Sequence, residues 1–173
     1  MLVASKKVVI KKGEGDAYWF GGVLMEIKVT GRDTGGQMAV VEMTAPANLG
    51  AAAPLHTHAG DETLYVLEGT IRVHVGDEVT ELLAGSQMHI PRDTWEYYEN
   101  VSNKTARVLV TYSGAASNID QFFREAGQRA TSRDVSAIPK GAADIATITQ
   151  IGKKYGIEVK AAPARPQAAA PPR

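Results

Sequence analysis

The 173-residue sequence contains no cysteine. That absence excludes disulfide bonds, thiolate metal sites and a cysteine nucleophile. The sequence also has no excess charge of either sign, because 19 basic and 19 acidic residues cancel. A protein that binds nucleic acid usually shows a basic excess or stripe, so we expect no nucleic-acid partner.

Long hydrophobic runs are missing as well. No segment approaches the roughly 20 apolar residues that a membrane-spanning helix needs. The opening MLVASKKVVIKK has short apolar pieces interrupted by lysines, which is not typical of a signal peptide. We therefore expect a cytoplasmic protein with no membrane partner. Its 44% hydrophobic and 22% charged residues are ordinary globular values, and the length suits one domain.

Residues 1–113 are rich in Val, Thr, Ile and Tyr, and glycine-containing breaks separate the apolar runs. Breaks spaced about 8–12 residues apart are typical of an all-β sandwich or barrel. The strands that we expect are Val8–Lys11, Tyr18–Val29, Met38–Thr44, Leu55–His58, Glu62–Glu68, Ile71–Val75, Glu78–Leu82, Met88–Ile90, Trp95–Glu99 and Ala106–Tyr112.

Residues 114–160 change character. A capping box at Asn118–Gln121 predicts a helix over Asp120–Ala126, and a stripe of isoleucines predicts a second helix over Ala142–Tyr155. We expect this extension to be a helical lid or packing element on the barrel, without chemistry of its own. Residues 161–173 are Ala/Pro low complexity and predict a disordered tail.

The residues with the clearest chemistry are His56, His58 and Glu62. Side chains two apart on a strand point to the same face, so the two imidazoles should converge. With the carboxylate after the next break they would form a facial triad with open coordination positions. This set suits one divalent transition metal, Fe, Ni, Mn, Co or Zn, better than calcium or magnesium.

The spacing around these residues resembles the first motif of the cupin superfamily at every defining position, namely Gly50-x5-His56-x-His58-x3-Glu62-x6-Gly69. The second cupin motif is present in part. Gly85, Pro91 and Asn100 are in place, Asp93 stands where the family prefers glycine, and Glu96 stands where the family has its last histidine ligand.

The resemblance extends over about residues 5–160 to single-domain cupins related to quercetin 2,3-dioxygenase, through GEGDAYWFGG, DTGG, FFRE and KYGIE. It implies a jelly-roll antiparallel β-barrel whose mouth holds a divalent metal, with an aromatic or polyketide-like substrate above it. We also expect a homodimer, because a barrel surface that pairs with itself would suit any of the functions considered below. Members of the wider group resemble cyclases and isomerases as well as dioxygenases.

The glutamate at position 96 leaves three hypotheses open. Glu96 is a fourth metal ligand, or it is a general acid or base beside a three-ligand metal, or the site has lost its metal and Glu62 and Glu96 form a proton-transfer pair. The complete first motif favours the first hypothesis, then the second. By strand alternation Tyr98 shares a face with Glu96 and is the expected substrate-binding residue, while His89 should face away.

These observations predict a metal-dependent enzyme acting on a small organic molecule, with Glu62 and Glu96 as catalytic residues. The favoured reaction is oxygenation of a phenolic, flavonol-like or polyketide-like substrate by dioxygen. The alternatives are a non-oxidative isomerase, cyclase or dehydratase that works through a metal-stabilised enolate, and a non-catalytic module that binds a small ligand.

Overall fold

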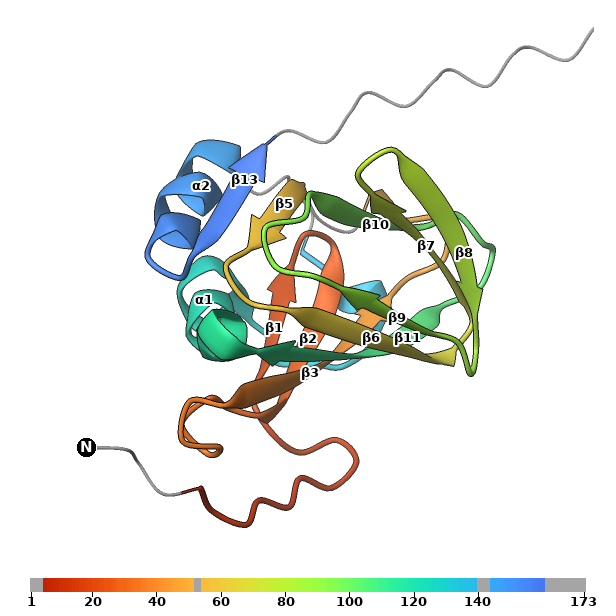
Figure 1. Cartoon of the computed structure of the whole chain (residues 1–173). Coiled ribbons are helices and arrows are strands. Elements are labelled where there is room, and N and C mark those ends of the chain that lie inside the picture. The colour runs from red at the N-terminus through yellow and green to blue at the C-terminus, as the bar shows by residue number, and fades with distance from the viewer. Residues whose placement is uncertain (1–4, 52–53, 140–143, 161–173) are drawn as a thin grey trace, which may run out of the picture.

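The computed structural model describes residues 5–51, 54–139 and 144–160. Two antiparallel sheets face each other and enclose the core, and the C-terminal elements cover one end (Figure 1). One sheet has the strand order β12 (Gln128–Arg129), β1 (Ala17–Phe20), β2 (Val23–Val29), β3 (Met38–Ala45), β11 (Ala106–Ser113), β6 (Glu62–Glu68) and β9 (Gln87–Ile90). The other has the order β13 (Ile157–Lys160), β5 (Leu55–His58), β10 (Glu96–Asn100), β7 (Thr70–Val75) and β8 (Glu78–Leu83), with β4 (Gly50–Ala51) beside β10.

Alternation along the strands builds the core. Every second residue of β11 is buried, and its inward neighbours on β3 and β6 are buried with it. Each such side chain stabilises the fold by about 1.5–3 kcal/mol through its removal from water. The innermost positions include Val41, Leu64, Val66, Val108 and Val110, all at most 1% exposed.

The strand predictions are confirmed to within about two residues, with two exceptions. The expected strand Tyr18–Val29 is two strands, because Gly21 and Gly22 both have positive φ and form a hairpin turn between β1 and β2. A two-residue Gly-Gly turn of this kind is a known hairpin signal. The expected strand Val8–Lys11 is wrong, because the structure has no strand over these residues. Strand β1, the next in the chain, already pairs with β2 on one edge and β12 on the other, which leaves no edge of β1 for a further strand.

The helices are α1 (Ile119–Ala126) and α2 (Ile145–Lys153), with 3₁₀ turns at Gly114–Asn118 and Val135–Ala137. The predicted capping box is wrong, because the Asn118 side chain makes no capping hydrogen bond and α1 continues directly from the first 3₁₀ turn. Asp144 caps α2, while the predicted start at Ala142 and the predicted tail 161–173 lie outside the described residues. No helix in the described ranges is long and apolar enough to cross a membrane.

At two positions of the cupin-like motifs the backbone has the positive φ for which glycine is preferred. Gly69 has φ +75°, and a Cβ there would lie 2.6 Å from the carbonyl oxygen of Thr105. Asp93, which replaces the expected glycine, has φ +61°. Aspartate is one of the few residues that tolerate this left-handed conformation, so the turn survives the replacement.

Asn100 joins three segments from a fully buried position. Its amide nitrogen donates to the carbonyl oxygens of Ala45, Pro46 and Lys104, and its amide oxygen accepts from the backbone and hydroxyl of Ser102. These bonds fasten the loop between β10 and β11 to the end of β3.

We expect Asn100→Ala to lower the free energy of unfolding by about 2–4 kcal/mol, because it leaves buried carbonyl groups without a donor. Urea denaturation measures this loss. The control is Asn103→Ala in the same loop, where the side chain is exposed and the change should stay within about 0.5 kcal/mol. Equal effects of both changes would contradict the role of Asn100.

Candidate metal centre

Four side chains of metal-binding type converge from three strands. His56 and His58 come from β5, Glu62 begins β6 and Glu96 begins β10. Glu96 is paired directly with His56 in the β5–β10 ladder, which puts the two side chains next to each other. Glu62 belongs to the opposite sheet, so the cluster joins both sheets at the covered end of the fold.

The cluster has the size of a metal site. One ligand atom from each residue lies within 4.8 Å of all the others. Two ligands on opposite sides of a bound ion are about 4 Å apart, since metal–nitrogen and metal–oxygen bonds are about 2.1 Å. Small side-chain adjustments would therefore bring all four atoms onto one ion.

Burial without partners is the second indication. Glu62 and Glu96 are each 1% exposed, and His58 is 5% exposed. Both ring nitrogens of His58 and Oε2 of Glu62 lack a hydrogen-bond partner among the described residues, although His58 Nε2 and Glu62 Oε2 are only 3.2 Å apart. Unpartnered buried polar atoms are costly, and a bound cation would satisfy those that face the cluster. The residues present fit a divalent transition metal.

The imidazole of His56 is oriented from outside the cluster. Its Nδ1 lies 2.9 Å from the carbonyl oxygen of Pro54, which leaves Nε2 for the cluster. A backbone carbonyl is a frequent outer partner of a metal-binding histidine, because it sets the ring tautomer. Burial, and then the neighbouring His58, lower the pKa of His56 to about 4, so its imidazole stays neutral and able to bind a metal at ordinary pH.

Tyr98 lies between the two carboxylates. Its hydroxyl group donates to Oε1 of Glu62 and lies 3.0 Å from Oε2 of Glu96. Burial, and then the negative charge of Glu62, raise the pKa of Glu96 well above its usual value. Burial also raises the pKa of Tyr98, so the phenol keeps its proton. The three side chains form a buried hydrogen-bonded group that can hold or pass a proton.

In the metal-free wild-type protein we expect the free energy of unfolding to fall as the pH rises above about 4.5. In the Glu96→Gln variant we expect this fall to disappear. The folded state keeps the Glu96 proton to a higher pH than the unfolded chain does. It therefore binds more protons in this range, and the free energy of unfolding falls as the pH rises.

Denaturation of both proteins in the presence of a chelator, from about pH 4.5 to pH 8, measures the difference. The lowered pKa of His56 acts in the opposite direction, raising stability between about pH 4 and 6.5, but it does so in both proteins. A difference between wild type and Glu96→Gln that does not change with pH would contradict the raised pKa of Glu96.

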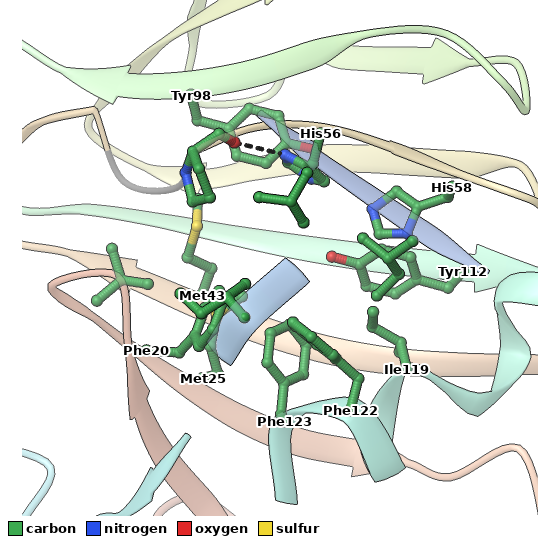
Figure 2. Close-up of a pocket in the computed structure, with 15 residues that line it drawn as sticks. Phe20, Met25, Met43, His56, His58, Tyr98, Tyr112, Ile119, Phe122 and Phe123 are labelled. Carbon is green, nitrogen blue, oxygen red and sulfur yellow. Dashed lines mark hydrogen bonds between the residues drawn. The ribbon is translucent and has the colours of Figure 1, made fainter. Parts of the chain in front are cut away.

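An apolar cavity lies against the cluster. Figure 2 shows His56, His58, Tyr98 and Tyr112 on one side of it and Phe20, Phe122 and Phe123 on the other. The Phe20 ring contacts the Phe122 and Phe123 rings edge to face, with centroids 5.2 and 5.5 Å away. Within the part of the chain that the structure describes, no lysine or arginine lines this cavity, and the side chains opposite the cluster offer hydrophobic contact.

The structure brings together every site residue that the sequence singles out: His56, His58, Glu62, Glu96 and Tyr98. It also places His89 on the exposed face, bonded to Thr63, as expected. Sequence reasoning missed Tyr112, whose ring centroid is 5.2 Å from that of His58, and the α1 phenylalanines. Alternation along β11 signals that Tyr112 points inward, but nothing local connects it to β5.

Comparison with known proteins identifies the central region. Residues 47–112 match a protein-family model described as "Cupin domain". The sequence is 30% identical over 112 residues to the quercetin 2,3-dioxygenase of Bacillus subtilis (strain 168), which covers 64% of this chain and 33% of that protein. The chain thus spans about a third of the length of this curated relative.

Solved structures share the fold. A predicted oxalate decarboxylase from Thermotoga maritima superposes with a TM-score of 0.56 at 18% identity, covering 61% of this chain and 97% of that one. KdgF from Halomonas sp. superposes with a TM-score of 0.53 at 14% identity, covering 64% and 96%. An RmlC-like cupin from Shewanella frigidimarina gives 0.51 at 17% identity, covering 63% and 91%. These likenesses confirm the predicted jelly-roll fold class.

Proposed function

Because this chain carries a cupin domain, we propose that it is a metal-dependent enzyme that oxygenates a small phenolic, flavonol-like or polyketide-like molecule with dioxygen. The observation that carries the proposal is the convergence of two histidines and two glutamates, buried beside an apolar cavity. The 30% identity to a quercetin 2,3-dioxygenase supports the choice of reaction.

His56, His58 and Glu62 would hold the metal, with Glu96 as the fourth ligand. When bound, the metal would supply Lewis acidity toward a substrate oxygen and, for a redox-active ion, electron exchange with dioxygen. A second neutralising carboxylate would make the ion a weaker Lewis acid than a three-histidine cupin set does. It would also make a divalent ion easier to oxidise, which suits reaction with dioxygen.

The protein groups around the metal have roles of their own. Glu62 or Glu96 would accept the proton of a phenol or enol substrate, since both carboxylates are hydrogen-bonded to Tyr98, which lines the cavity. Tyr98 would hold both carboxylates in position by its hydroxyl group. The apolar lining would exclude bulk water, which protects reactive species and strengthens the electrostatic interactions of the site.

A non-oxidative isomerase, cyclase or dehydratase is the second candidate. The linked carboxylates and phenol of Glu62, Glu96 and Tyr98 favour it. In this case one glutamate would remove a proton next to a carbonyl group and return it at another carbon of the same molecule. No oxygen would be consumed, and zinc would serve as well as iron.

Elemental analysis of the purified protein without added metal is the first test. About one Fe, Ni, Mn or Co per chain, together with oxygen uptake when flavonols and other phenols are supplied, would support the oxygenase. Zinc, or turnover that proceeds equally well without oxygen, would support the second candidate and overturn the first. A protein that contains no metal and takes none up on titration would overturn both.

A further inference from the structure

The cavity beside the metal cluster is too small for an organic substrate. Its volume is about 30 Å³. By this measure a water molecule needs about 10–15 Å³, whereas a cavity that binds benzene has about 150 Å³. Water or dioxygen fits, but a single aromatic ring does not. A single aromatic ring could therefore enter this cavity only if part of its wall moved.

Two parts of the wall are firmly held. The strands β2, β3 and β11 are each paired on both sides within the seven-stranded sheet. Helix α1 is anchored by Phe122 and Phe123, both 3% exposed, and by an ion pair between Arg124 and Asp16. The buried carboxylate of Asp120 also accepts from the backbone N–H of Gly31, which fastens the start of α1 to the end of the sheet.

The third part of the wall is the C-terminal unit of α2 and β13, residues 144–160, here called the α2–β13 unit. Ile148 of α2 and Ile157 and Val159 of β13 line the cavity. Figure 1 shows the unit at the covered end of the molecule, with β13 alongside β5. Every residue of β5 has a partner in β13, with Ile157 opposite His58 and Val159 opposite His56.

This unit is the least anchored part of the wall. Strand β13 ends the order of its sheet and pairs with β5 alone within the described residues. The buried residues of α2 are Ile148 and Gly152. The contacts with α1 include an exposed ion pair between Lys154 and Glu125, a hydrogen bond from the Tyr155 hydroxyl group to the same glutamate, and an edge-to-face contact between the Tyr155 and Phe122 rings, with centroids 6.2 Å apart. Elements with few buried contacts open at the lowest free energy.

We propose that the α2–β13 unit selects the substrate: it closes the cavity over the metal cluster and moves aside to admit an uncharged, apolar part of the substrate. Ile148, Ile157 and Val159 then contact this part of the molecule. Among the described residues the lining has no lysine or arginine, so a carboxylate pointing away from the metal would be buried there without a cationic partner. The substrate depends on the proposed function, but the movement of the wall does not.

The wall is also separate from the matched cupin region. Residues 47–112 contain all four residues of the cluster, whereas the whole α2–β13 unit lies beyond them. The metal cluster therefore belongs to the part that this chain shares with other cupins. The three residues of the α2–β13 unit that line the cavity lie outside that matched region.

A reversible cross-link tests the movement directly, because the chain contains no cysteine of its own. Thr57 and Glu158 are opposite each other in the β5–β13 ladder. Their neighbours on each strand line the cavity, so by strand alternation these two side chains point away from it. Opposed residues of antiparallel strands have Cα atoms about 4.5–5.5 Å apart, which suits a disulfide. In the double variant Thr57→Cys/Glu158→Cys, oxidation locks the unit and a reductant frees it.

Fluorobenzene is the probe, since it is apolar and does not bind metals, and ¹⁹F NMR measures its rate of entry. We expect oxidation to slow entry at least tenfold and reduction to restore it. Entry at the same rate in both states would overturn the proposal. Circular dichroism of the oxidised and reduced protein confirms that both are folded.

A second pair of variants does not depend on the cross-link. Ile148→Ala removes a wall side chain and should speed fluorobenzene entry at least tenfold. The matched control, Ile145→Ala on the exposed side of the same helix, should leave the rate unchanged. Equal rates in these two variants would overturn the proposal. The metal content of the same samples separates the two proposals. If metal is bound but neither the cross-link nor Ile148→Ala changes the rate of fluorobenzene entry, only the moving α2–β13 unit is refuted. If these changes alter the rate but the protein takes up no metal, only the proposed function is refuted.

Discussion

Replacement of His58 by alanine is expected to remove the bound metal and with it all turnover, while the protein stays folded. The substitution deletes one of two imidazoles in a cluster of four ligands. Changes to residues that only support a ligand already weaken metal binding about 10–100-fold, so loss of the ligand itself should cost at least ~100-fold. Metal content after dialysis against a weak chelator, with circular dichroism of the same sample, measures both effects.

Two further variants make this result specific. His56→Ala should behave in the same way, because its ring lies next to that of His58, with centroids 4.9 Å apart. His89→Ala is the matched control, since this histidine lies on the exposed face of β9 and should leave the metal content unchanged. A folded His58→Ala protein that retains its full metal content would show that the site has been assigned wrongly.

The charge and shape of residue 96 should have the second largest effect. Glu96→Gln keeps the size of the side chain but removes its negative charge and its ability to accept a proton. We expect turnover to fall by a factor of about 10²–10⁴, the usual contribution of a general acid or base. We also expect weaker metal binding, because the neutral amide is a poorer ligand than the carboxylate.

Glu96→His separates the roles of ligand and base. It restores the ligand that cupins usually have at this position, so we expect a full complement of metal. Turnover should still fall, because the bond from Tyr98 to a carboxylate at position 96 is lost. Metal titration and steady-state kinetics on both variants measure these effects. Unchanged metal affinity and unchanged turnover in both would show that Glu96 is neither ligand nor base.

Local signals in the sequence were sufficient to single out the four His and Glu residues that could hold a metal and to predict most of the strands. His56 and His58 share a face because side chains alternate along any strand, whatever surrounds it. Gly69 requires a positive φ that other residues avoid, and Asp93 keeps the same conformation where glycine is usual. The hairpin between β1 and β2 was also written locally, in Gly21 and Gly22, although we predicted one continuous strand there.

The lining of the cavity could not be predicted from the sequence in the same way. Phe20, Phe122 and Ile157 are far apart in the chain and meet beside the His/Glu cluster because α1 and β13 cover the same end of the fold. Tyr98 shows the same limit: alternation placed it beside Glu96, but its bond to Glu62 crosses from one sheet to the other.

By itself, the sequence determined the all-β fold class and the residues that can hold a metal, because turn conformation and strand alternation are local properties. The tertiary structure decided how Glu62 and Glu96 share the hydroxyl group of Tyr98, how small the cavity is, and that residues of α2 and β13 line it. The physical reason is that burial and cavity shape arise from contacts between distant segments, which no local pattern specifies.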